Sequence, residues 1–160
     1  MDEFSRELNQ LLVSTYHDIG KLEESMLHST SGMDLSIGEM HMLEAVGTSR
    51  DKGLLVCELA QRMELTPPTV TVAVNKLAAK GYVVKTKSQS DKRSVIVTLT
   101  RAGQRVNVAH RYFHENMIRS VEKLLTPSER DGMMHGMRTL NEFFRKALDG
   151  AEKPEGESKA

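Results

Sequence analysis

The sequence predicts a mainly α-helical chain of six helices in which a helix-turn-helix is followed by a small β-hairpin wing, an α+β arrangement. Long stretches near both ends repeat apolar residues at steps of three and four, the period of an amphipathic helix. In the middle of the chain, two short helical patterns flank a tight turn, and two runs rich in β-branched residues follow them. A length of 160 residues suits one compact domain.

The first two helices are indicated by periodicity and by capping residues. The first is expected within residues 1–30, and its apolar stripe consists of Phe4, Leu8, Leu11, Leu12, Thr15, Ile19, Leu22 and Met26. Ser36, with Glu39 three residues later, has the pattern of a capping box that opens a second helix, which Gly47 ends.

The predicted helix-turn-helix comprises a short helix over residues 55–63 and a second helix that runs to Lys80. Thr66 is the expected N-cap of the second helix, and Pro67 takes the first helical position, where a missing amide hydrogen costs nothing. Its inward stripe is Val70, Val74 and Leu77, and Gly81 ends it.

The segment after this helix predicts a hairpin and two more helices. Residues 82–87 and 94–99 have the composition of strands, and the polar residues 88–93 between them form the expected turn. Thr100 is expected to cap a long helix that ends near Leu124. The segment Thr126-Pro127-Ser128-Glu129 opens the last helix, whose apolar stripe ends at Leu148.

The charges are separated along the chain although the net charge is zero. Residues 1–48 contain nine acidic and two basic residues, a net charge of −7, whereas residues 76–105 contain eight basic residues and one acidic residue, a net charge of +7. A basic block of this kind can follow a phosphate backbone, and the acidic block would be repelled from it.

The outward face of the helix after Thr66 has the composition of a helix that reads DNA bases. Pro68, Thr69, Thr71, Val72, Asn75 and Lys76 lie on that face, and most are small or uncharged. Short side chains can approach base edges, methyl groups can contact thymine, and the Asn75 amide could bond adenine. A basic turn beside such a helix is placed to reach phosphates or the minor groove.

The wing carries a resemblance to a known family. Asp91-Lys92-Arg93, followed by residues 94–98 and Leu99-Thr100, matches the D-x-R-x5-L-T wing signature of MarR regulators, and the resemblance extends over about residues 4–148. The family and the helix pattern together imply that contacts to a double-stranded DNA operator come from Thr66, Pro67, Pro68, Thr69, Thr71, Val72, Asn75, Lys76, Ser88, Ser90, Asp91, Lys92 and Arg93.

The resemblance also implies a domain organisation and an assembly. Residues 1–148 would form a single MarR-like domain, in which 1–30 and 100–148 are the dimerisation helices of a homodimer and 36–99 the DNA-binding lobe. Residues 149–160 are too polar to bury and are expected to be a disordered tail. With no run of apolar residues long enough to span a bilayer, we expect a soluble cytoplasmic protein that has no membrane partner.

Three segments are most similar to the branch of the family that represses fatty-acid synthesis: residues 35–41, 69–75 and 110–117. The resemblance implies a long-chain acyl group on acyl carrier protein as co-repressor, and no resident cofactor. Ten methionines would suit a flexible acyl chain, although they could equally fill a core that is short of aromatic residues. The double proline Pro67-Pro68 and the single cysteine Cys57 depart from the branch.

Histidines on two predicted helices form a second candidate site. His110 and His114 lie four residues apart on one face, and His41 lies in the second helix, with Glu23 or Glu24 on the first. The expected effector pocket consists of Met40, His41, Ala109, His110, Phe113 and His114. We interpret the histidines as a polar cluster that lines this pocket. A zinc site is the alternative, because the positions also resemble the ligands of zinc-sensing MarR regulators.

The sequence favours a transcription regulator over two other classes. A winged-helix module whose basic hairpin binds an acidic protein remains an alternative, which binding to random duplex DNA would test. An enzyme is not expected, because Cys57 has no readable catalytic partner and no glycine-rich phosphate loop is present.

Overall fold

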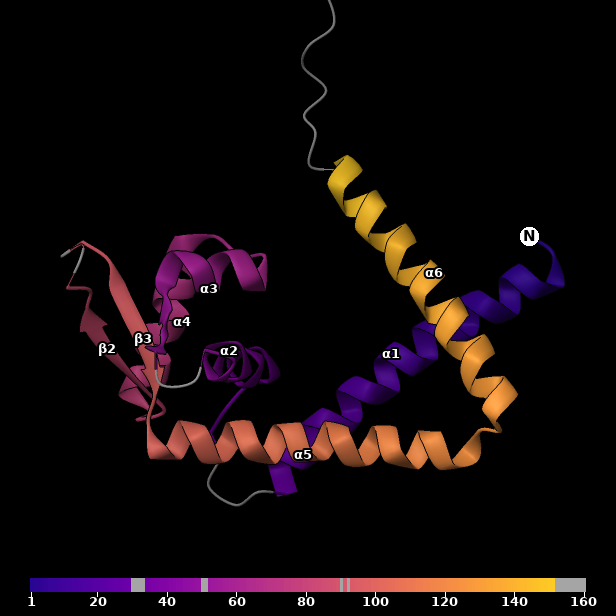
Figure 1. The fold of residues 1–160 in the computed structure, drawn as a ribbon, viewed down its shortest axis with the longest axis horizontal. Helices are drawn as coiled ribbons and strands as arrows, with labels where there is room; N and C mark the ends of the chain where they lie inside the picture. The colour runs from indigo at the N-terminus through magenta and orange to yellow at the C-terminus, as the bar shows by residue number, and fades with distance from the viewer. Residues whose placement is uncertain (30–33, 50–51, 90, 92, 152–160) are drawn as a thin grey trace, which may run out of the picture. The chain divides into compact units, whose positions relative to one another are not determined.

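The computed structural model describes residues 1–29, 34–49, 52–89, 91 and 93–151 (Figure 1). The described helices are α1 (Glu3–Ser29), α2 (Ile37–Gly47), α3 (Val56–Met63), α4 (Pro67–Ala79), α5 (Arg101–Leu124) and α6 (Pro127–Ala151). The strands are β1 (Leu54–Leu55), β2 (Val83–Lys87) and β3 (Val95–Leu99). The predicted six helices and hairpin wing are confirmed. The chain divides into two compact units, Met1–His114 and Glu115–Ala160.

The wing belongs to a three-stranded antiparallel sheet with the order β1-β3-β2. Lys85 of β2 pairs with Val97 of β3, and Leu54 of β1 pairs with the other side of Val97. The sequence analysis missed β1 and placed Leu55 inside a helix, whereas Leu55 is extended and serves as the N-cap of α3. Two residues are too few to show the alternation that identifies a strand.

The core of the first unit packs α2, α3 and α4 against the sheet (Figure 1). Among its members, Leu43, Leu59 and Val97 are completely buried. The predicted inward stripe of α4 is confirmed, since Val70, Val74 and Leu77 are at most 1% exposed. Burial of this face fixes the rotation of α4 about its axis, and the opposite face must therefore point to solvent.

The predicted helix caps are present. The Ser36 amide donates to Glu39 Oε2 at 2.9 Å and the Glu39 amide donates to Ser36 Oγ at 3.2 Å, which completes the capping box of α2. Thr126 and Glu129 bond in the same reciprocal way at the start of α6. These bonds satisfy amide groups that the first turn of a helix leaves without partners.

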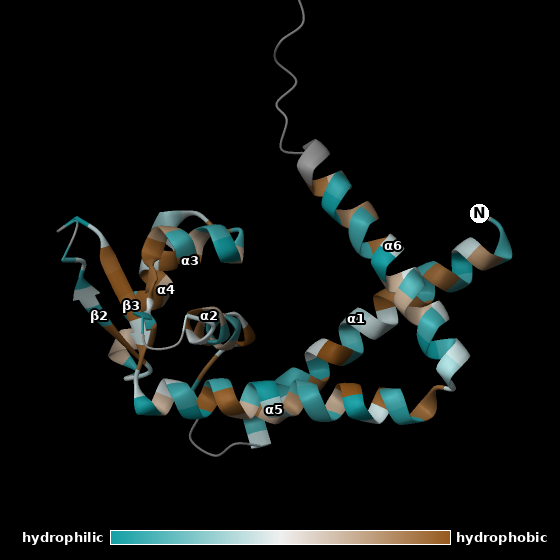
Figure 2. Cartoon of the chain, in the orientation of Figure 1, coloured by the Kyte–Doolittle hydropathy of each residue, from teal (hydrophilic) through white to brown (hydrophobic). Residues whose placement is uncertain are grey.

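Apolar side chains are exposed along α1 and α6, each considered within its own unit. Figure 2 shows hydrophobic positions alternating with hydrophilic ones along both helices. Phe4 is 72% exposed and Leu22 is 50% exposed, although both lie on the predicted stripe of α1. In α6 the exposed residues are Met133, Met134, Met137, Phe143, Phe144 and Leu148. α6 extends three residues past Leu148 to Ala151, and the rest of the predicted tail, 152–160, lies outside the described residues. No described helix is long and apolar enough to cross a membrane.

The start of α5 is held against the base of the wing. The Thr100 amide donates to the Tyr82 carbonyl at 3.0 Å, and the Thr100 hydroxyl accepts from the Gly103 amide at 3.1 Å. A Cβ atom on Gly103 would lie 2.2 Å from the same Tyr82 carbonyl oxygen. Only glycine permits this approach of the helix to the strand backbone.

We expect Gly103→Ala to lower the free energy of unfolding by about 1–3 kcal/mol, because the added methyl group would force α5 and the Tyr82 backbone apart. Urea denaturation of the purified protein measures the change. Gly38→Ala is the matched control, since a Cβ atom there meets nothing within 4 Å and the substitution favours a helix. Equal stability of the Gly103 and Gly38 variants would contradict this account of the α5 junction.

Candidate functional site

The turn between α3 and α4 sets the start of the exposed helix. Glu64 ends α3 in the left-handed conformation, with φ at 53°. Thr66 then caps α4, accepting the Thr69 amide hydrogen at 3.4 Å, and its hydroxyl lies 2.8 Å from that of Thr69. Pro67 and Pro68 occupy the first helical positions, where no intrahelical amide bond is lost.

All the predicted contact residues of α4 are exposed, and six of them lie on one of two flanks of the helix. Pro67, Thr71 and Asn75 lie on the flank that faces the wing. Thr69, Val72 and Lys76 border an open groove beside α2. Thr71 therefore borders the wing side of α4 and Val72 the side toward α2.

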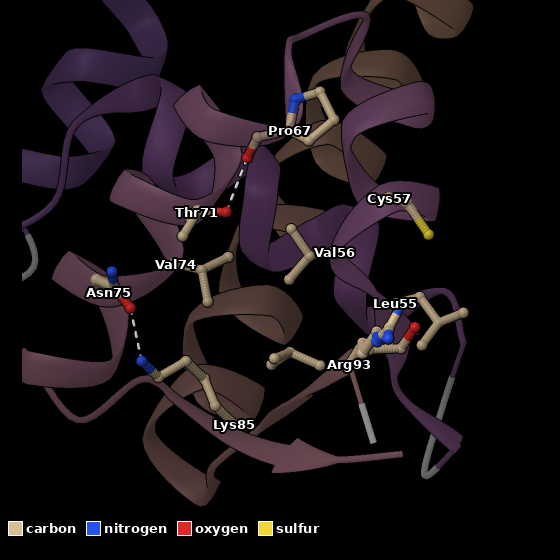
Figure 3. A pocket seen from close by; sticks show the side chains of 11 residues that line it. Leu55, Val56, Cys57, Pro67, Thr71, Val74, Asn75, Lys85 and Arg93 are labelled. Atoms are coloured by element: carbon tan, nitrogen blue, oxygen red, sulfur yellow. Dashed lines mark hydrogen bonds between the residues drawn. The ribbon is translucent and has the colours of Figure 1, made fainter. Parts of the chain in front are cut away.

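A cavity of about 320 Å³ separates the wing flank of α4 from the hairpin (Figure 3). It is lined by Leu55, Val56, Cys57, Pro67, Thr71, Val74, Asn75, Lys85, Arg93, Ser94 and Val95. Among the described residues, the lining contains two cations and no carboxylate, so the cavity favours an anionic or hydrogen-bond-accepting group.

A hydrogen bond across this cavity joins α4 to the wing. The Lys85 ammonium donates to Asn75 Oδ1 at 2.5 Å, and the Thr71 hydroxyl donates to the Pro67 carbonyl at 2.8 Å (Figure 3). The sequence analysis named Asn75 and missed Lys85 as a site residue. The pairing of β2 with β3 brings Lys85 to Asn75, and no local pattern in the sequence signals that meeting.

The wing turn is closed by Asp91. Its Oδ2 accepts the Ser94 hydroxyl at 2.6 Å and its Oδ1 accepts the Arg93 backbone amide at 3.0 Å. These bonds, the Ser94 one foremost, hold the pKa of the Asp91 carboxyl below its usual range. Asp91 thus fixes the backbone that precedes the Arg93 side chain. Ser88 is buried, and its amide donates to the Ser94 carbonyl at 2.9 Å.

Arg93 lines the cavity and is exposed. Ser90 and Lys92, which the sequence analysis also assigned to DNA contact, lie outside the described residues.

The C-terminal end of α4 is tied to α2 by an ion pair. Lys80 Nζ lies 2.9 Å from Glu39 Oε2 and 3.7 Å from Asp34 Oδ2. Burial alone would raise the pKa of Glu39, but the Ser36 amide and Lys80 outweigh it and lower that pKa. The bond to Glu39 raises the pKa of Lys80. Lys80 therefore belongs to the basic block of the sequence but is neutralised within the fold.

Carboxylate and imidazole groups from α1, α2 and α5 converge at a second site, all within the first unit. Glu23 Oε1 lies 3.1 Å from His114 Nε2, 3.5 Å from His41 Nε2 and 3.8 Å from His110 Nε2. His110 Nε2 lies 2.8 Å from His114 Nε2. The structure thus selects Glu23 rather than Glu24 as the carboxylate of the cluster.

His110 is completely buried at the centre of this cluster. Burial lowers its pKa, with partial compensation from the charge of Glu44. Glu44 Oε2, which the sequence analysis did not name, lies 3.3 Å from His110 Nδ1, but the geometry is not that of a hydrogen bond. A neutral imidazole is the form that binds metal ions.

The other predicted effector residues lie in different surroundings. Met40 is buried in the core, and Ala109 borders a shallow apolar hollow on α5. Phe113 is half-buried and packs its ring edge-on against His114. A separate cavity of about 650 Å³ between α1 and α2 includes His41 and Glu23, together with Tyr16 and Ile19.

We expect Glu39→Gln to lower the free energy of unfolding by about 1 kcal/mol near pH 7, because it removes the charge that pairs with Lys80. The folded-state pKa of Glu39 is depressed, so its contribution is present above the unfolded value of 4.5 and is lost as the pH falls through the folded value. The folded-state pKa of Lys80 is raised above the unfolded value of 10.5, so its contribution to stability is fully present below pH 10.5 and is lost only as the pH rises through the folded value.

Denaturation at about pH 7 and about pH 3 measures this difference, which should shrink at the lower pH. Lys21→Met, which removes an exposed ion pair with Asp18, is the control and should have little effect at either pH. A Glu39→Gln effect that is the same at both pH values would show that the loss is not electrostatic.

Comparisons with known proteins agree on one class. A sequence model of a protein family, described as MarR family, matches residues 31–94 of this chain. In Bacillus subtilis (strain 168), the uncharacterized HTH-type transcriptional regulator YhjH is 25% identical over 126 residues, which span 79% of this chain and 71% of YhjH. The HTH-type transcriptional repressor YetL is 30% identical over 95 residues, which span 59% of this chain and 57% of YetL. These relatives are transcription regulators rather than enzymes.

Solved structures share the fold. The FabT of Streptococcus pneumoniae, determined in complex with DNA, superposes with a TM-score of 0.85 at 26% identity, covering 89% of this chain and 99% of FabT. The S. aureus MepR–DNA complex superposes with a TM-score of 0.71 at 19% identity, covering 84% of this chain and 96% of MepR. The second likeness concerns the fold alone.

Proposed function

We propose that this chain is a winged helix-turn-helix transcription regulator of the MarR family, and that it acts as a homodimeric repressor that binds a double-stranded DNA operator. The observation that carries the proposal is the exposed face of α4, which presents short, mostly uncharged side chains beside a basic hairpin. Such a face suits a major groove, and the likeness to FabT bound to DNA supports the same use.

The distribution of charge supports this orientation on DNA. Lys76, Lys85, Lys87 and Arg93 are exposed on α4 and on the wing, where phosphates would lie on either side of a groove. Lys80 is paired with Glu39 and contributes less. The acidic residues of α1 would be repelled from the backbone of the duplex.

The homodimer is supported by the exposed apolar residues of α1 and α6. Phenylalanine, leucine and methionine side chains that are half exposed or more along two long helices would be unstable in water without a partner. A two-fold dimer would present two copies of α4, which must be about 34 Å apart to enter successive major grooves.

We expect Arg93→Ala to weaken binding to every duplex by a similar factor and to lower the dependence of log affinity on log salt by about one unit, because a wing arginine meets phosphates or the minor-groove potential. Asp91→Ala should act in the same direction, since it releases the backbone that carries Arg93. Fluorescence anisotropy on a duplex from the upstream region of this protein's own gene, and on a random duplex, measures both quantities over a salt series.

The control is Lys21→Ala, which removes one cation from the acidic helix α1 and should leave both duplexes bound as before. An Arg93→Ala variant with unchanged affinity and salt dependence would remove the wing from the DNA interface. Absence of binding to any duplex would favour the alternative, a winged-helix module that binds an acidic protein.

For the effector, we propose that the chain represses fatty-acid synthesis genes in response to a long-chain acyl group carried by acyl carrier protein. The resemblance of residues 35–41, 69–75 and 110–117 to that branch supports this, as does the match to FabT over nearly its whole length. The cavity between α1 and α2, with Tyr16, Ile19 and Ile37 in its wall, offers apolar surface to an acyl chain.

A second candidate effector is a divalent metal ion of the zinc type, which the cluster around Glu23 supports. Tetrahedral zinc with bonds of about 2.0–2.1 Å keeps its ligand atoms about 3.3 Å apart. Glu23 Oε1 lies 3.5 Å from His41 Nε2 and 3.8 Å from His110 Nε2, and one ligand atom from each of these three residues lies within 4.8 Å of the other two. An ion bound there would join α1, α2 and α5 and so couple the effector to the DNA-binding lobe.

We expect His41→Asn to weaken zinc binding more than about tenfold, because losing a ligand costs at least as much as losing one of its outer-shell hydrogen-bond partners. Competition with a chromophoric chelator measures the affinity, and the exposed His28 of α1, changed to Asn, is the control. Anisotropy on the same upstream duplex, with zinc or with long-chain acyl carrier protein, then identifies which effector alters DNA binding. Equal zinc affinities of the two variants would exclude the cluster as the metal site.

A further inference from the structure

We propose that Asn75 and Lys85 act together as one hydrogen-bond-donating unit that selects a guanine at one position of each operator half-site. This inference rests on the proposed function, since it concerns which base the DNA-binding face reads. It assigns a specificity role to Lys85, a residue of the wing, and it changes the base expected for Asn75 from adenine to guanine.

Asn75 and Lys85 extend from two elements, α4 and β2, that buried residues hold in place. Asn75 lies in the third turn of α4, one turn beyond Thr71, and the buried residues Val74 and Leu77 fix its direction. Lys85 lies at the centre of β2, opposite the fully buried Val97. Their bond of 2.5 Å therefore joins two anchored elements, and Figure 3 shows it at the edge of the cavity.

The bond makes this pair rich in donors, with one lone pair of Asn75 Oδ1 left against four N–H groups. Asn75 Oδ1 accepts one N–H of the Lys85 ammonium, so the Asn75 amide keeps two N–H donors on Nδ2. Lys85 keeps two further N–H donors. Within the described part of the chain, these donors have no other hydrogen-bond partner, and both side chains are exposed.

The chemistry of the bases then decides the preference. An asparagine that reads adenine needs a free acceptor for the N6 amino group as well as a donor for N7. Guanine presents two acceptors, O6 and N7, in the major groove, and a lysine beside them is a common specific contact. A unit with four N–H donors and one remaining lone pair matches guanine, and the ammonium beside Asn75 Oδ1 would repel the adenine amino group from that oxygen.

The charge of Lys85 remains available for this contact. In the part of the chain that the structure describes, the lining of the cavity contains Arg93 and no carboxylate, and no ion pair there neutralises the ammonium. Lys80, at the other end of α4, shows the opposite case, because Glu39 and Asp34 surround it. The Thr71 hydroxyl donates to the Pro67 carbonyl and so does not supply a competing donor on this flank.

The test is a selection from a library of duplexes with a random core, followed by sequencing, with wild type, Lys85→Met, Asn75→Ala and the double variant. Lys87→Met is the matched control, since Lys87 is the next exposed lysine on the same face of β2. Wild type should enrich G·C at one position of each half-site. Lys85→Met should lower the preference for guanine there about tenfold or more, whereas Lys87→Met should weaken all sequences equally.

The double variant should lose no more discrimination at that position than either single variant, because the two residues act as a unit. Thermal unfolding of the four variants controls for folding. A Lys85→Met profile identical to that of Lys87→Met, or a wild-type preference for adenine that Asn75→Ala abolishes alone, would overturn the inference while the proposed function stands. Wild-type protein that enriches no duplex would overturn both.

Discussion

The burial of one face of α4 is the constraint on which the rest of the DNA-binding lobe depends. Val70, Val74 and Leu77 are completely enclosed, and because a helix turns by about 100° per residue, their positions determine where every other residue of α4 points. The core thereby turns Thr71 and Asn75 toward the wing and Val72 and Lys76 toward α2. The outward residues of α4 can be assigned to DNA contact only because burial of the inward face fixes which residues point outward.

A second set of backbone contacts fixes the wing relative to α4. β3 lies between β1 and β2, so the hairpin is attached to the segment that leads into α3 as well as to its own partner strand. The Tyr82 carbonyl accepts the Thr100 amide where α5 begins, and Gly103 permits the close approach. The distance between Asn75 and Lys85 is therefore a property of the sheet and the core rather than of two flexible side chains.

Local patterns were sufficient to predict the helices, their caps and the hairpin, since each depends on residues close together in the sequence. Ser36 and Glu39 are three residues apart, and the stripe of α4 repeats within 13 residues. β1 has only two residues, and Lys85 meets Asn75 through strand register, so neither leaves a local signal. Sequence reasoning likewise found three histidines of the second cluster but could not choose between Glu23 and Glu24 or find Glu44, because those contacts are set by helix packing.

Net charge is a poor guide to what this chain binds, because the fold decides which charges are neutralised. The basic block supplies Lys80 and Lys85 at equal formal charge, yet among the described residues Lys80 contacts two carboxylates whereas the partner of the Lys85 ammonium is an amide oxygen. An ammonium that keeps its charge and its free N–H groups can exchange water for a phosphate or a base at small cost, whereas a paired one must first break its ion pair. The capacity of this surface to bind DNA therefore follows from the placement of a few acidic residues, Glu39 above all, away from the wing.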